Sequence, residues 1–155
     1  MIEPKAPRRR TSAIQRKYLT YFIAIACCLS LCGCALKASR QGVPPEVESV
    51  VTTVGEDADE ERYEKIHNEA APEWRSAADL EKTVRVFSTV REKLGKVKSR
   101  QLHAASEETK SQEHSFVLTY QTKFERGEGM ETFTLVERNR QWLLAKYFVN
   151  SIALQ

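Results

Sequence analysis

All four cysteines of the chain lie within eight consecutive positions, at Cys27, Cys28, Cys32 and Cys34. Thiols at this density could form disulfides, hold zinc or carry another covalent modification. Disulfides that stabilise a small domain join cysteines dispersed along the chain, and these four close no loop around other residues. A zinc site usually needs a second ligand pair a dozen or more residues away, and the nearest histidine is His67. The spacing favours neither chemistry, and we expect no metal or other cofactor.

The residues around the cysteines have the layout of an export signal. Five basic side chains within residues 8–17 precede an uncharged, largely apolar run over residues 18–36. A basic region followed by an apolar one is typical of a secretory signal peptide. The length of the run is also close to the roughly 20 residues that a transmembrane helix needs. The segment therefore fits either a cleaved signal peptide or an uncleaved signal anchor.

The sequence LCGC that ends at Cys34 resembles the lipobox of bacterial lipoproteins. Leu31 and Gly33 match the aliphatic and small positions of that motif, and Cys32 is a less usual occupant of its position. The resemblance implies that Cys34 receives diacylglycerol and that cleavage before it removes residues 1–33. The other three cysteines would then be small apolar residues of a discarded leader.

The lipoprotein resemblance also implies a place in the cell. Ala35, not aspartate, follows the acylated cysteine, so the expected destination is the outer membrane, on the face toward the periplasm. Contact with the membrane would run through the lipid. Residues 34–56 would then comprise the lipidated cysteine and a tether, whose first part is small, polar and rich in proline and glycine. Residues 46–54 fit either a short helix or a strand.

Charge is distributed unevenly across the predicted cleavage site. Removing residues 1–33 takes away six of the 24 basic and one of the 21 acidic residues. That leaves 18 against 20, so the net charge changes from +3 to −2. The remainder has no basic stripe of the kind that phosphate groups require, and we expect no nucleic-acid partner.

Helical patterns occupy the first part of the predicted domain, residues 57–155. One amphipathic helix is expected from Asp57, where acidic residues favour a helix start, until Pro72 stops it. A second is expected to open at Ser76, with Asp79 three residues later as a variant of the capping box, and to end at Gly95.

Strand patterns occupy the rest of the chain. Alternating or continuous apolar residues predict four strands, over residues 97–106, 114–124, 130–138 and 141–154. Short turns between consecutive strands indicate an antiparallel meander, and helices ahead of it indicate an α+β fold. The last segment has apolar residues on both faces, so we expect it to be the most deeply buried.

Three short motifs carry a resemblance to a known group of proteins. Leu94-Gly95, Glu131-Thr132-Phe133 and Trp142 to Tyr147 resemble small bacterial lipoproteins of unknown function with a nuclear-transport-factor-two-like, or cystatin-like, soluble domain. The resemblance implies two helices packed on a curved four-stranded antiparallel sheet, after the signal helix. Its motifs are structural, so they say little about activity.

Residues that could perform acid–base catalysis are few. Related folds include isomerases and dehydratases, but function must be argued from a site. His67 lies beside an apolar stripe, His103 is next to a loop, and His114 begins a strand where a solvent-facing polar residue is expected. None has an apolar surrounding that would tune it for proton transfer, so we predict no catalytic residue.

A ligand cavity between the helices and the sheet would have aromatic walls. The available side chains are Phe116, Tyr120, Phe133, Trp142 and Phe148. Aromatic residues at alternating strand positions more often form core, so a carrier of a small apolar ligand and a module that binds an envelope protein both remain open. We predict a membrane-anchored envelope lipoprotein with a non-catalytic binding or interaction domain. The alternatives are a ligand-pocket enzyme of isomerase or dehydratase type, or an uncleaved signal-anchored protein.

Overall fold

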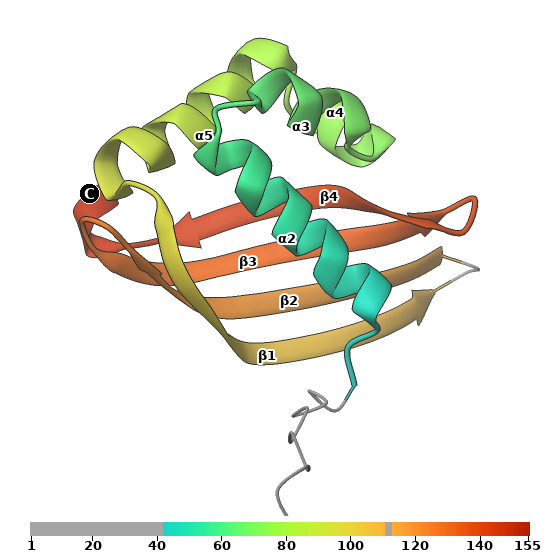
Figure 1. Cartoon of the computed structure of the whole chain (residues 1–155). Helices are drawn as coiled ribbons and strands as arrows, with labels where there is room; N and C mark the ends of the chain where they lie inside the picture. Colours follow the sequence, from blue (N-terminus) through green and yellow to red (C-terminus); the bar gives the residue numbers. More distant parts are fainter. Residues whose placement is uncertain (1–41, 111–112) are drawn as a thin grey trace, which may run out of the picture. The chain divides into compact units, whose positions relative to one another are not determined.

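The computed structural model describes residues 42–110 and 113–155. These ranges hold four helices followed by four strands (Figure 1). The helices are α2 (Pro45–Asp59), α3 (Tyr63–Glu69), α4 (Pro72–Ala77) and α5 (Leu80–Leu94). None of the helices in these ranges is long and apolar enough to span a membrane. The predicted leader, with Cys34 and the rest of the lipobox, lies outside the described residues.

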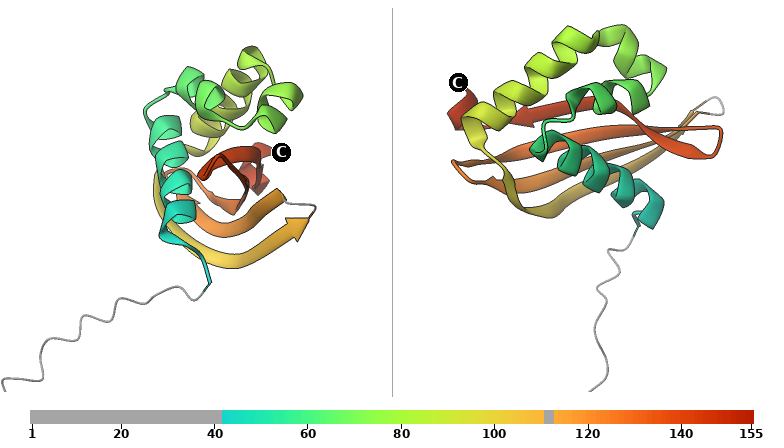
Figure 2. Two further views of the ribbon diagram at one scale, coloured as in Figure 1. Left: turned by 90° about the vertical axis from the view of Figure 1, so that its right-hand side faces the viewer. Right: turned by 45° about the horizontal axis from the view of Figure 1, so that its top comes forward.

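The strands form one antiparallel sheet in chain order. They are β1 (Val97–Lys110), β2 (Glu113–Phe124), β3 (Glu128–Arg138) and β4 (Gln141–Asn150), and a short 3-10 helix, η2 (Ile152–Leu154), follows. Register shifts interrupt β1 twice and the β3–β4 pairing once, and such bulges bend a sheet. Figure 2 shows the resulting curvature. The prediction of an α+β fold with an antiparallel meander is confirmed.

The core lies between the concave face of the sheet and the helices. On β2 the predicted alternation holds, because the side chains of its inner face are all buried: Phe116, Leu118, Tyr120, Thr122 and Phe124. Helix α2 covers this face with Val47, Val51 and Val54, and α5 adds Phe87. Apolar side chains at helical spacing on α2 and α5 thus meet apolar side chains at strand spacing on the sheet.

The tether predicted over residues 34–56 is too long at its C-terminal end. Residues 45–56 form most of α2, where Pro45 occupies the first helical position that favours proline. Val47, Val51 and Val54 recur at helical spacing, and the burial of this stripe outweighs the β propensity of the same residues. The folded domain therefore begins at Pro45 and not at Asp57.

Two predicted helix boundaries are also wrong. Pro72 begins α4 instead of ending a long helix, because its missing N–H costs nothing at a helix start. Ser76 lies inside α4, and the N-cap of α5 is Asp79, whose Oδ1 accepts from the N–H of Lys82 at 2.8 Å. The single helix predicted from Asp57 to Pro72 is in fact divided between the end of α2 and α3, and α4 follows it.

The last strand is not the most buried one. β4 lies at the edge of the sheet, where Phe148 is 65% exposed, and beyond it Ile152 is 87% exposed. Residues 152–154 form η2 instead of continuing the strand. β4 is thus buried near its middle, at Leu144 and Ala145, and exposed toward its end.

The N-cap of α5 is Asp79 in the structure, whereas the sequence predicted a helix that opens at Ser76. Replacing Asp79 with alanine should lower the free energy of unfolding by about 1 kcal/mol, because an N-cap acceptor is lost. Ser76→Ala is the matched control, since Ser76 is exposed within α4 and should change stability by less than about 0.5 kcal/mol. Urea denaturation of both variants measures the difference, and a larger loss for Ser76→Ala would contradict the assigned cap.

Candidate functional site

A buried carboxylate is the centre of the strongest polar cluster in the described domain. Glu131 on β3 is 1% exposed and receives hydrogen bonds from each of the other three strands. Arg100 on β1 donates from Nε at 2.7 Å and from Nη2 at 3.2 Å. Thr122 on β2 donates at 2.6 Å, and Tyr147 on β4 donates its hydroxyl at 2.8 Å. One side chain from every strand thus meets at this carboxylate.

Arg100 reaches Glu131 by passing close to α2. A Cβ atom on Gly55 would collide with the guanidinium of Arg100, so a residue without a side chain is needed at this point of the helix. The guanidinium carbon also lies 5.6 Å from the ring centroid of Phe133, a cation–π distance. Arg100 is therefore enclosed by the helix on one side and by the sheet on the other.

The electrostatics of the cluster keep the two titratable partners of Glu131, Arg100 and Tyr147, protonated. Burial lowers the pKa of Arg100, but the hydrogen bond and charge of Glu131 outweigh it, so the pKa lies above its ordinary value. Burial, followed by the charge and hydrogen bond of Glu131, raises the pKa of Tyr147 well above its ordinary value. The phenol remains a donor and the guanidinium remains a cation, as the carboxylate requires.

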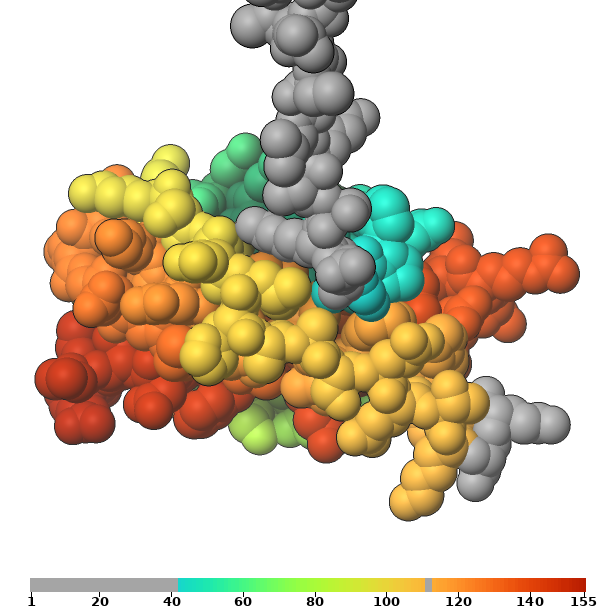
Figure 3. All heavy atoms as spheres, turned by 90° about the horizontal axis from the view of Figure 1, so that it is seen from below, coloured from blue at the N-terminus to red at the C-terminus, as the bar shows by residue number. Residues whose placement is uncertain are grey.

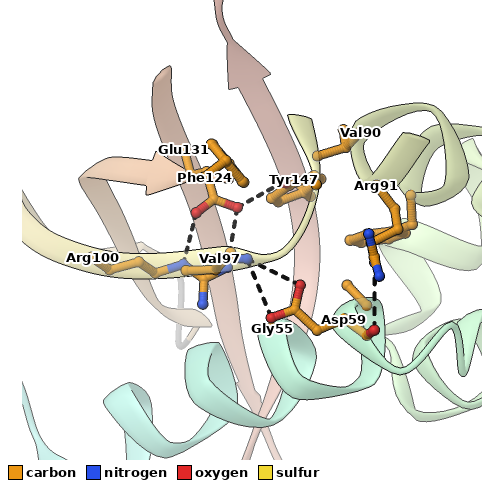
Figure 4. Close-up of a pocket in the computed structure, with 12 residues that line it drawn as sticks. Gly55, Asp59, Val90, Arg91, Val97, Arg100, Phe124, Glu131 and Tyr147 are labelled. Atoms are coloured by element: carbon orange, nitrogen blue, oxygen red, sulfur yellow. Dashed lines mark hydrogen bonds and ion pairs between the residues drawn. The ribbon is translucent and has the colours of Figure 1, made fainter. Parts of the chain in front are cut away.

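Beside this cluster lies a small cavity of about 20 Å³ (Figure 4). Arg100, Glu131 and Tyr147 lie on one side of it, and Asp59 of α2 and Arg91 of α5 lie on the other. Asp59 also accepts the N–H of Val97 at 3.2 Å, which fixes the start of β1. A cavity of this size holds about one water molecule. It is too small for an organic substrate.

The chemistry open to Glu131 is limited by its partners. Both carboxylate oxygens already accept two hydrogen bonds each, which is close to the capacity of a carboxylate. A general base needs a free lone pair within reach of a substrate proton. In this arrangement the carboxylate holds strands together and presents no lone pair to a substrate.

The sequence contained a signal for this cluster that the prediction missed. Glu131 precedes Phe133 and Leu135 by two and four positions, so the period of a strand places it on the inward face. A carboxylate at an inward position needs a partner. Alternation counted from Val97 would place Arg100 on the wrong face, because a register shift follows Val97, whereas alternation counted back from Leu102 places it inward.

The five predicted pocket-lining residues have different places in the structure. Phe116, Tyr120 and Phe133 belong to the buried core, and Trp142 packs against it at its margin. Their rings contact one another: the centroids of Phe116 and Trp142 are 5.3 Å apart, and those of Tyr120 and Phe133 are 6.0 Å apart. Phe148 lies apart from them on the surface. The aromatic side chains of the sheet therefore pack against one another, and Trp142 also lines a cavity of about 140 Å³ between α2, α3 and β4.

The three histidines are not brought together. His67 Nδ1 lies 3.1 Å from the hydroxyl of Thr83 between α3 and α5, and His103 is exposed on β1. His114 has a carboxylate at each ring nitrogen: Nδ1 is 3.0 Å from Glu137 and Nε2 is 2.5 Å from Glu107. Because ionised carboxylates only accept, this geometry favours the imidazolium form, in which both ring nitrogens donate.

No cluster of three or more metal-ligating side chains occurs within residues 42–110 and 113–155. Asp57 is a second buried carboxylate, but Arg62 Nε at 2.7 Å and Lys65 Nζ at 3.1 Å bind its oxygens. Its ion pairs join the end of α2 to α3. Like Glu131, Asp57 is therefore neutralised by neighbouring side chains.

The region that contains the Glu131 cluster matches a known family. The family model is that of a protein of unknown function, DUF4019, and the match covers residues 51–147, more than half of the chain. The chain belongs to the DUF4019 family. No curated protein matches it. All four members of the Glu131 cluster lie within the DUF4019 match, whereas the predicted leader lies before it.

The Arg100–Glu131 pair should dominate the stability of the DUF4019 domain. Arg100→Met leaves a buried carboxylate without its cation and should cost about 3–5 kcal/mol of unfolding free energy. Arg100→Met combined with Glu131→Leu should recover part of that loss, because no buried charge remains unpaired. Arg85→Met is the control: its ion pair with Glu81 is exposed and should contribute less than about 1 kcal/mol. Urea denaturation measures the unfolding free energy of each variant. A double variant less stable than Arg100→Met would show that the unpaired charge of Glu131 is not the cause of the loss.

The contacts of His114 with Glu107 and Glu137 should make the stability of the DUF4019 domain depend on pH. The hydrogen bonds to Glu107 and Glu137 raise the pKa of His114 above the ordinary value of 6.5. A raised pKa in the folded state means that the stabilisation is fully present below about pH 6.5 and is lost as pH rises through the folded-state pKa. The stability difference between wild type and His114→Gln should therefore shrink between pH 6 and pH 9. The stability difference between wild type and the exposed His103→Gln variant should not depend on pH. A pH-independent difference for His114→Gln would contradict the contacts of His114 with Glu107 and Glu137.

Proposed function

We propose that this DUF4019 protein is a lipoprotein of the bacterial envelope whose domain binds a partner protein and does not catalyse a reaction. One observation carries the binding part of the proposal: the buried charged cluster leaves no room for a substrate beside it. The space beside the buried charged cluster is about 20 Å³, and the carboxylate there is saturated by its own protein. A domain with this interior offers its surface for function.

The anchoring part of the proposal is supported by the leader sequence and by the position of α2. The motif around Cys34 fits lipidation, and α2 begins at Pro45, so residues 35–44 alone would connect lipid and fold. Ten extended residues span at most about 35 Å. Each buried methylene of an acyl chain contributes on the order of 0.8 kcal/mol, so two or three chains would hold the protein at the membrane. With Ala35 after the cysteine, we propose the outer membrane, facing the periplasm.

The curved sheet under a set of helices also fits the resemblance to nuclear-transport-factor-two-like domains. Some proteins with such folds are isomerases or dehydratases with a pocket between helices and sheet. The buried Glu131 and Tyr147 are the groups that would favour an enzyme of that kind. Here Tyr147 donates to Glu131, which also accepts from Arg100, and this supports binding over catalysis.

Acylation of Cys34 is the test of the anchor. The wild-type protein should enter the detergent phase of a Triton X-114 separation and should incorporate an alkyne-labelled fatty acid. Cys34→Ser should lose the label, whereas Cys32→Ser, the control from the same motif, should keep it. Recovery of membrane-bound protein that still begins at Met1 would show instead that the apolar segment is an uncleaved signal anchor.

A further inference from the structure

The free edge of β4 is open to another strand. β4 pairs with β3 on one side, and alternate residues of an edge strand direct their N–H and C=O groups away from the sheet. Near the start of this edge Ala71 donates its N–H to Leu144 O at 2.9 Å. Among the described residues, no other backbone group from outside the sheet bonds to β4. The stretch from Lys146 to Asn150 therefore offers unpaired backbone groups.

Helix α5 lies beside this open edge (Figure 1), and a groove of about 370 Å³ separates the two elements. The ring of Phe87 on α5 stacks on Tyr147 of β4 with centroids 4.8 Å apart, which fixes the spacing. The side chains along the groove come from both elements: Arg85, Val86, Thr89, Val90, Phe148 and Val149. The groove thus combines a strand edge for backbone pairing with an apolar helix face for side chains.

We propose that an extended segment of a partner protein adds to the β4 edge and places its side chains against α5. This inference rests on the proposed function and names its binding site. Strand addition to a sheet edge gains affinity from main-chain hydrogen bonds and specificity from pockets for alternate side chains. Phe148, 65% exposed, and Val86 would bury apolar side chains of the added segment.

The charge of the groove indicates the chemistry of the segment. Arg85 is the charged residue that lines it, and Lys146 is exposed on the same stretch of β4. Arg85 pairs with Glu81 at 2.9 Å, but both side chains are well exposed, so the pair is weak and can exchange for another carboxylate. The segment should therefore alternate apolar residues and carry an acidic residue near Arg85.

The opposite edge of the sheet is protected against such pairing. β1 is interrupted by two register shifts, and its last residues are exposed and charged at Glu107, Glu108 and Lys110. Bulges and charged side chains are the features by which edge strands avoid new partners. Figure 3 shows this side of the molecule, where β1 (yellow) lies near α2 (cyan). β4 has one register shift and one exposed charge, Lys146, so the two edges differ in the number of features that oppose strand addition.

A display library of random dodecapeptides, selected on the full chain in detergent micelles, tests the groove directly. Enriched peptides should alternate apolar residues with at least one acid, and their binding, measured by fluorescence anisotropy, should be lost when a central residue is replaced by proline. Val86→Lys and Thr89→Glu should each weaken binding at least tenfold. Thr89 is exposed on α5, so its variant reports on the groove even if Val86→Lys perturbs folding.

Two further variants serve as control and as charge test. Val84→Lys changes the same residue type on the same helix outside the groove and should leave affinity unchanged. Arg85→Glu should weaken the acidic peptides and favour versions in which lysine replaces the acid. Absence of enriched peptides, or binders that ignore the Val86 and Thr89 variants, would overturn the proposal. So would self-association of the chain that Thr89→Glu abolishes, because a second copy would then occupy the groove.

Photo-crosslinking in intact cells separates this inference from the proposed function. The crosslinker p-benzoylphenylalanine is placed at Phe148 in the groove or at Lys123, which is exposed on β2. A protein crosslinked from position 148 and lost with Thr89→Glu supports the groove. Crosslinks from position 123 alone would refute the groove and leave protein binding intact. No crosslink from either position would count against both.

Discussion

The fold depends on one buried carboxylate that bonds to all the other strands. Glu131 collects donors from Arg100, Thr122 and Tyr147, so β1, β2 and β4 are each tied to β3 at the same level of the sheet. A buried charge is tolerated because it is paired and hydrogen-bonded, and removing one partner would leave the full desolvation cost. The cluster therefore adds to the register that the buried apolar face specifies, because a shift of any strand would move its donor away from Glu131.

The same constraint accounts for the course of α2 and the start of β1. The guanidinium of Arg100 needs the space that Gly55 leaves on α2, and Asp59 at the end of that helix holds the N–H of Val97. Helix and edge strand are thus fixed to each other by polar contacts at the margin of the apolar core. The open edge of β4 and the groove beside α5 are the places where we propose that the domain accepts a partner.

The early start of α2 matters for the proposed anchor. Val47, two residues after Pro45, is fully buried in the core, so the folded domain begins almost where the tether ends. A tether of about ten residues would keep the domain close to the membrane surface while leaving it free to rotate. A partner would then have to approach within that layer.

The sequence by itself determined the order of elements and the inward face of the sheet. Alternation in β2 identified Phe116, Leu118, Tyr120, Thr122 and Phe124 correctly, because strand geometry assigns sides by parity alone. It also placed four strands in the correct order, although β1 continues to Lys110, beyond its predicted end at residue 106. Helix boundaries around Pro72 and Ser76 were missed, because proline and serine fit both ends of short helices and only packing decides between them.

Tertiary structure decided what lies next to Glu131. Bulges in β1 change the parity of the strand, so Val97 and Arg100 both face inward although three positions separate them. Tertiary structure also decided that β4 is an edge, which leaves Phe148 exposed despite the apolar character of its strand. Both outcomes depend on which segments become neighbours in space, and a local pattern of hydrophobic residues carries no information about a neighbour that is distant in sequence.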